Sequence, residues 1–162
     1  MIYVKTGDGG DKTTSAMGVA LRALGHGKRV VIVQFMKGRF TGEMKAFSKF
    51  RNCDFKQFGR GEWVYPGDVQ EVDKRLAIEA LKYAIKSLST NPFLLVLDEV
   101  NLACAFKLIK VKDVLALLKK AKCHVVLTGR QAPKSFMCVA DFVTEYTDLK
   151  RKDVNARPGI EY

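Results

Sequence analysis

The chain has 162 residues, 48% of them hydrophobic, and a formal net charge of +11 at pH 7. Its length fits a single domain over residues 1–162. The sequence shows neither a signal-peptide pattern nor an apolar run near the roughly 20 residues that span a bilayer, so we expect a cytoplasmic protein without membrane contact. The positive charge predicts an anionic partner such as a nucleoside triphosphate, whereas the spread of Lys and Arg over all segments argues against nucleic acid.

The first feature along the chain is a glycine-rich loop, Thr6–Thr14, between a β-branched run at 1–5 and an amphipathic helical run at 16–24. A strand, a glycine loop and a helix that starts with Lys-Thr-Thr are typical of a phosphate-binding loop. Glycines let backbone N–H groups converge on an anion, Lys12 can reach the outer phosphates, and the Thr13 hydroxyl can bind Mg²⁺. The alternative is a glycine turn that merely joins a strand to a helix.

This loop departs from the common phosphate loop in two ways. Gly7 and Lys12 are one residue closer in sequence than in the usual pattern, so the loop is tighter. Asp11 takes the place of the glycine that normally precedes the lysine, and its carboxylate would repel a triphosphate.

The rest of the chain alternates between predicted strands and helices. The dense apolar runs at 29–35, 93–97 and 124–127 predict buried parallel strands. Further strands are expected at 53–58 and 142–146, and helices at 42–51, 68–89, 111–121 and 133–139. This alternation predicts a three-layer α/β fold, with a mostly parallel sheet of five or six strands and helices on both faces.

Polar residues follow two of the buried strands. Asp98 and Glu99 end the apolar run at 93–97, as in the Walker-B pair that holds Mg²⁺ directly or through water. The alternative for Asp98 is a cap on the next helix. Arg130 follows the strand at 124–127, where it would contact the phosphates or the rest of the nucleotide, or lie on the surface.

Two stretches near the N-terminus carry a family resemblance. Arg22–Val30 runs into Gln34–Gly38 after the shortened phosphate loop, and this combination resembles the ATP:corrinoid adenosyltransferases of the cobalamin-biosynthesis type. The resemblance continues through Gly42-Glu43, Leu97–Asn101, Thr128–Arg130, Ala140-Asp141, Val143–Glu145 and Gly159–Tyr162. It covers nearly the whole chain.

The resemblance implies a P-loop fold of the RecA-like type and a specific activity. Enzymes of this family transfer the 5′-deoxyadenosyl group of ATP to the Co(I) of a reduced corrinoid and release triphosphate. ATP would therefore be the co-substrate, Mg²⁺ the metal, a reductase the source of Co(I), and a homodimer the assembly. No side chain is expected to act as a catalytic base.

The motifs and the resemblance together imply roles for individual residues. The expected nucleotide-binding residues are Gly7, Asp8, Gly9, Gly10, Asp11, Lys12, Thr13, Thr14, Arg22 and Arg130, and the expected metal-binding residues are Thr13, Asp98 and Glu99. Trp63 is the expected corrinoid contact, in a glycine loop where Glu62 replaces the family's usual Phe. The alternative for Trp63 is an ordinary, partly buried aromatic residue.

Two other functions stay open at this point. One is a catalytically silent paralogue that binds a nucleotide or corrinoid, suggested by Asp11, the altered loop at Trp63 and a tail, Lys150–Tyr162, that is shorter than the family's and lacks its histidine. The other is a RecA-like nucleic-acid ATPase, suggested by the net charge.

Overall fold

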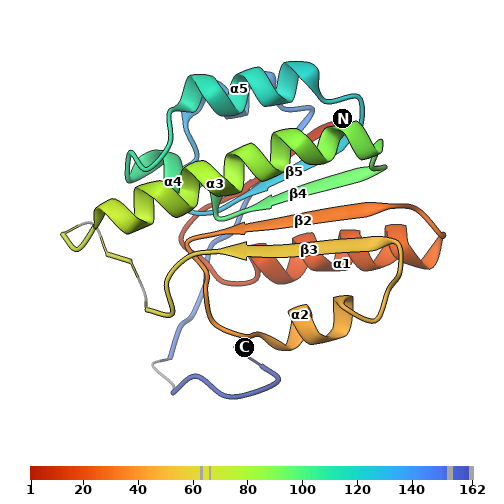
Figure 1. Cartoon of the computed structure of the whole chain (residues 1–162). Coiled ribbons are helices and arrows are strands. Elements are labelled where there is room, and N and C mark those ends of the chain that lie inside the picture. Colours follow the sequence, from red (N-terminus) through yellow and green to blue (C-terminus); the bar gives the residue numbers. More distant parts are fainter. Residues whose placement is uncertain (63, 66, 153–154, 161–162) are drawn as a thin grey trace.

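The computed structural model describes residues 1–62, 64–65, 67–152 and 155–160. Its strands form one sheet in the order β3-β2-β4-β5-β1-β6, and every pairing between them is parallel (Figure 1). The strands are β1 (Ile2–Thr6), β2 (Val30–Phe35), β3 (Cys53–Phe58), β4 (Leu94–Asp98), β5 (His124–Thr128) and β6 (Phe142–Glu145). The predicted α/β fold with a sheet of five or six strands is confirmed.

Helices cover both faces of this sheet. They are α1 (Lys12–Gly25), α2 (Gly42–Phe47), α3 (Glu71–Ser87), α4 (Val100–Ala105), α5 (Val111–Lys120) and α6 (Lys134–Val139), with a short 3₁₀ helix, η1 (Leu88–Thr90), after α3. Figure 1 shows α1 and α2 on one face and α3, α4 and α5 on the other. The result is the three-layer arrangement that the alternating sequence predicts.

The sheet has one hydrophobic core on each face, because side chains alternate between the two faces along each strand. In β2, Val30 and Ile32 pack with α1, whereas Val31 and Val33 pack with the helices on the opposite face. All six residues of β2 are buried, because a parallel strand at the centre of a three-layer fold has no solvent-facing side. The Val/Ile-rich run at 30–33 therefore marks a strand covered on both faces.

Some helix boundaries differ from the sequence prediction. α3 begins at Glu71 rather than at residue 68, because Gln70 and Asp73 form a capping box in which the Gln70 N–H donates to Asp73 Oδ2 at 2.9 Å. α4 is a short helix that the periodicity did not predict. It begins directly after Glu99, whose φ of 61° turns the chain sharply at the end of β4.

The carboxyl ends of the parallel strands meet at one edge of the sheet, and the loops that follow β1, β2, β4 and β5 lie there. In the described parts of the chain, no helix combines the length and the apolar character needed to cross a lipid bilayer.

Candidate functional site

The glycine loop between β1 and α1 is pressed against the segment that follows β6. The Gly9 N–H donates to the Tyr146 carbonyl at 2.8 Å, and the Gly10 N–H donates to the Asp148 carboxylate at 3.0 Å. A Cβ on Gly7, whose φ is 98°, would lie 2.7 Å from the Tyr146 nitrogen, and a Cβ on Gly9 would lie 2.8 Å from the Thr147 nitrogen. Glycine is needed at both positions because backbone passes backbone there.

Lys12 starts α1 and folds back over this loop. Only 7% of the residue is exposed, and its ammonium donates to the Gly9 carbonyl. Burial lowers the pKa of Lys12 despite the opposing influence of Glu99. The structure thus holds a nearly buried lysine at the N-terminus of a helix, where the helix dipole favours an anion.

Asp11 adopts the left-handed conformation with φ 63° and ψ 6°. It precedes α1 without a side-chain capping bond, and its side chain faces solvent. This conformation explains why a glycine is common at the position, since glycine reaches positive φ without steric cost. Thr14 is exposed in the first turn of the same helix.

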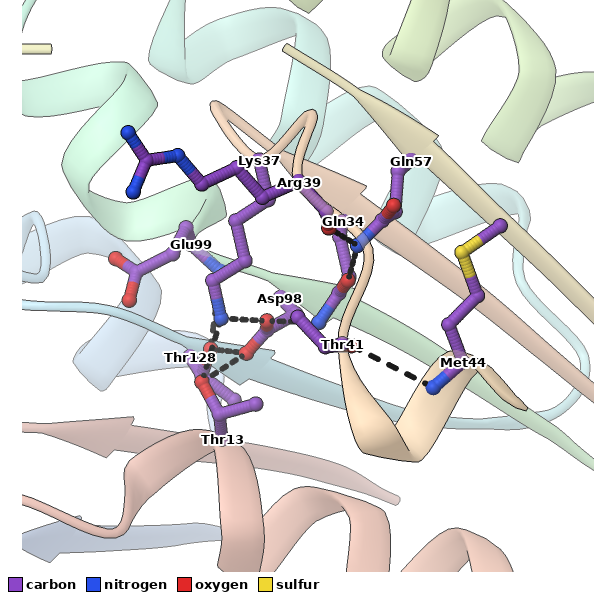
Figure 2. A network of polar contacts seen from close by, with 10 residues as sticks. All are labelled: Thr13, Gln34, Lys37, Arg39, Thr41, Met44, Gln57, Asp98, Glu99 and Thr128. Carbon is purple, nitrogen blue, oxygen red and sulfur yellow. Dashed lines mark hydrogen bonds and ion pairs between the residues drawn. The ribbon is translucent and has the colours of Figure 1, made fainter. Parts of the chain in front are cut away.

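A buried carboxylate at the end of β4 organises the next part of the site (Figure 2). Asp98 Oδ1 accepts from Thr13 Oγ1 at 2.9 Å and from Thr128 Oγ1 at 2.6 Å. Asp98 Oδ2 accepts from Gln34 Nε2 at 2.9 Å and from Lys37 Nζ at 2.7 Å. Asp98 therefore binds the phosphate-loop helix, through Thr13, to three strands of the sheet.

The ion pair with Lys37 fixes the charge of this carboxylate. Burial alone would raise the pKa of Asp98, but the charge of Lys37 and the hydrogen bonds from Lys37, Thr128 and Thr13 hold that pKa below its usual value. Burial likewise opposes the charge of Lys37, yet Asp98 and then Glu99 raise the pKa of the lysine. Both groups are charged at neutral pH.

Glu99 is the next residue, and its pKa is shifted in the opposite direction from that of Asp98. Burial, followed by the charge of Asp98, raises the pKa of Glu99, although Lys37, Lys12 and Arg130 oppose this. Its Oε2 atom is buried and has no hydrogen-bond partner among the described residues. Buried polar atoms without a partner are rare in proteins, and a bound ion is one of the explanations for them.

Thr13 and Glu99 therefore fit the oxygen donors that Mg²⁺ prefers. Asp98 fits less directly, because both of its oxygens already accept two hydrogen bonds, and its contact with Thr13 would orient a metal ligand rather than supply one.

Arg130 and Asp8 lie on the exposed rim of the site. The Arg130 guanidinium donates to the Asp8 carbonyl at 3.2 Å and lies 3.9 Å from the Asp8 carboxylate, with 47% of the arginine side chain exposed. Arg130 thus contacts the glycine loop through Asp8, and its role in nucleotide binding stays a prediction.

Arg22 lies elsewhere. It is in the last turn of α1, ten residues or about 15 Å along the helix from Lys12. There it lines a separate hollow with His26 and His124, among others. The structure does not bring Arg22 to the phosphate loop, and its nucleotide-binding role stays a prediction. Trp63 lies outside the described residues, so its role also stays a prediction.

The loops that follow β2 and β3 touch backbone to backbone. A Cβ on Gly38 would lie 2.7 Å from the Arg60 carbonyl carbon, and a Cβ on Gly59 would lie 2.8 Å from the Lys37 carbonyl carbon. Arg60 pairs with Asp68 at 2.6 Å and with Asp73 at 3.0 Å, which fastens the second loop to the start of α3.

Sequence reasoning missed several residues of the site. Gln34, Lys37 and Thr128 contribute to the Asp98 cluster, and Asp148 caps a loop amide. A signal for the first three existed, since each lies at or just after the carboxyl end of a predicted strand. Asp148 carried no such signal.

Comparison with known proteins adds an independent finding. A family model described as "ATP:corrinoid adenosyltransferase BtuR/CobO/CobP" matches residues 1–162. Corrinoid adenosyltransferases of a Sinorhizobium species and of Pseudomonas aeruginosa are each 35% identical over the whole chain, which spans 80% and 83% of their lengths. Corrinoid adenosyltransferase CobA of Salmonella typhimurium is 31% identical over the whole chain and 85% of its own length.

Proposed function

The chain belongs to the ATP:corrinoid adenosyltransferase family, and from that premise we propose that it transfers the 5′-deoxyadenosyl group of ATP to the Co(I) of a reduced corrinoid. The observation that carries the proposal is the full-length family match on a chain whose glycine loop, buried Lys12 and buried Asp98 converge at one sheet edge. The substrates are ATP and the corrinoid, and the products are the adenosylated corrinoid and triphosphate.

The reaction needs little acid–base chemistry from side chains. Co(I) supplies the electron pair for the new cobalt–carbon bond to C5′ of the ribose, and the C5′–O bond breaks with its electron pair leaving on the triphosphate. The protein positions the two reactants and stabilises negative charge on the leaving group. No side chain is assigned as a catalytic base.

The loop residues Gly7 to Thr14 would bind the triphosphate. The amide groups at the start of α1 and the ammonium of Lys12 supply positive charge, and Arg130 lies at the rim where it can contact outer oxygens. Thr13 and the unpartnered Glu99 would hold Mg²⁺, which when bound would neutralise charge on the leaving group. Asp98 would keep Thr13 in place.

The loop after β3 would face the corrinoid, with Trp63 as the contact. Its described part is well anchored: the Arg39 guanidinium donates to the Gly61 carbonyl, and Arg60 pairs with Asp68 and Asp73. An anchored loop can press an aromatic ring on a planar substrate at a lower entropy cost.

The sequence and the family together support further proposals. We propose a single nucleotide-binding domain over residues 1–162, a homodimer in the cytoplasm, and a separate reductase that delivers Co(I).

An anaerobic assay tests the proposed function. Chemically reduced cob(I)alamin, Mg-ATP and the purified protein should give the absorbance change of cobalt–carbon bond formation, with one triphosphate released for each adenosyl group transferred. Release of inorganic phosphate instead, or no cobalt–carbon bond, would contradict the proposal. The Lys12→Ala variant provides the matched control for the phosphate loop.

A further inference from the structure

Lys37 occupies an unusual position in the site. It lies just after β2, and its ammonium is 3.0 Å from Thr13 Oγ1 and 2.7 Å from Asp98 Oδ2 (Figure 2). Thr13 is the residue next to Lys12 at the start of α1. The lysine therefore places a second positive charge within hydrogen-bond distance of the phosphate-loop helix.

The four donors to Asp98 are not equally free to leave. Gln34 and Thr128 are fully buried within strands, and Thr13 is fixed in the first turn of α1. The Lys37 side chain is 21% exposed and has a flexible four-carbon stem. If Lys37 turned away, the Asp98 carboxylate would still accept three hydrogen bonds and would not be left without donors.

The surroundings of Lys37 suit a cation that can be exchanged. Glu99 Oε2 and Glu43 Oε2 are both buried without hydrogen-bond partners among the described residues, and both carboxylates act on Lys37 electrostatically. The ammonium thus occupies a negatively charged position between Thr13 and Asp98. The cation of an incoming triphosphate competes for that position, and the triphosphate offers the lysine several charged oxygen acceptors.

We propose that Lys37 is a second triphosphate-binding lysine, which holds the cation position between Thr13 and Asp98 in the free protein and turns onto the triphosphate oxygens when ATP binds. The inference rests on the proposed function for the identity of the ligand. In this role Lys37 positions the leaving triphosphate and stabilises its negative charge, in addition to the contacts from the glycine loop.

The test uses calorimetric titration of the full chain with ATP and with inorganic tripolyphosphate, each in EDTA and in excess Mg²⁺. Lys37→Met removes the charge and keeps the apolar stem, and Lys45→Met, at an exposed lysine of the neighbouring α2, is the matched control. We expect Lys37→Met to weaken both ligands about tenfold or more in EDTA. The loss should be smaller in Mg²⁺, because the metal neutralises part of the triphosphate charge that Lys37 would otherwise face, and the affinity for adenosine, which has no phosphate, should not change.

A second variant guards against loss of folding. Lys37→Gln keeps a hydrogen-bond donor near Asp98, and urea unfolding monitors both variants. Lys37→Arg retains the charge and should recover most of the affinity for tripolyphosphate.

The outcomes separate the inference from the proposed function. If the unmodified protein binds ATP and tripolyphosphate and the folded Lys37 variants bind them equally well, Lys37 is only a structural ion pair and the inference is wrong. If the unmodified protein binds neither ligand, the proposed function itself fails, and the inference fails with it.

Discussion

Replacing Asp11 tests the proposal that this loop binds a triphosphate in spite of the Asp11 carboxylate. Two changes separate the causes: Asp11→Asn removes only the charge, and Asp11→Gly removes the charge and the Cβ together. Asparagine tolerates the left-handed conformation well, so the variant keeps the observed φ of 63°. The pair therefore distinguishes electrostatic repulsion from backbone strain.

The magnitude follows from the exposure of Asp11. Two like charges about 4 Å apart repel by about 1 kcal/mol at the dielectric of water, which applies because this side chain faces solvent. Both variants should therefore bind Mg-ATP about fivefold more tightly than the unmodified protein. Asp11→Gly should additionally relieve up to about 1–2 kcal/mol of conformational strain, a gain that would appear in the free energy of unfolding rather than in ATP affinity.

Calorimetric ATP titrations at low and high Mg²⁺ measure the effect. The gain should be larger at low Mg²⁺, since the metal screens the phosphates. If neither variant binds ATP more tightly at any Mg²⁺ concentration, the carboxylate points away from the triphosphate or assists the site, and the repulsion argument is refuted.

Three other substitutions test separate parts of the site. Lys12→Ala should weaken ATP binding about tenfold or more by calorimetry, because a charge-assisted contact is lost. Lys86→Ala, on the exposed surface of α3, should have no effect. If the Lys12→Ala variant binds ATP as tightly as the unmodified protein, Lys12 does not belong to the site. Trp63→Ala should slow adenosylation of cobalamin far more than it weakens ATP binding, and an unchanged rate and corrinoid affinity would make Trp63 a scaffold residue. Gly7→Ala should lower the free energy of unfolding by about 1–3 kcal/mol and impair ATP binding, because its Cβ would meet the Tyr146 backbone. Gly18→Ala, at an open helical position, should instead raise the free energy of unfolding by about 0.5–1 kcal/mol. Chemical denaturation measures both changes, and a Gly7→Ala protein as stable as the unmodified one would contradict the close approach of the two backbones.

The fold was largely predictable from local pattern. The glycine loop at 7–11 and the apolar runs at 29–35 and 93–97 lie where the structure has the β1–α1 loop, β2 and β4. Periodicity and turn residues are local signals, and a three-layer α/β fold repeats them along the chain. The short helix α4 escaped prediction because six residues give too little periodicity.

The candidate site was predictable only in part. Asp98 and Lys37 are 61 residues apart, and their contact exists because β2 and β4 are neighbours in the sheet. Strand order depends on tertiary packing, which no local pattern encodes. Arg22 is the opposite case, because it is near the glycine loop in sequence and not in space. The family resemblance suggested that it binds the nucleotide there, but ten helical residues separate it from Lys12 by about 15 Å.

The backbone contact between Gly38 and Gly59 links the two substrates of the proposed reaction. It joins the loop that carries Lys37 to the loop that leads to Trp63, and no side chain lies between them to absorb a displacement. A movement of Lys37 onto the triphosphate would therefore displace the loop that we propose to face the corrinoid. Thermodynamic linkage then requires ATP to change the affinity for corrinoid by the same factor by which corrinoid changes the affinity for ATP, and titrating each ligand in the presence of the other measures that factor.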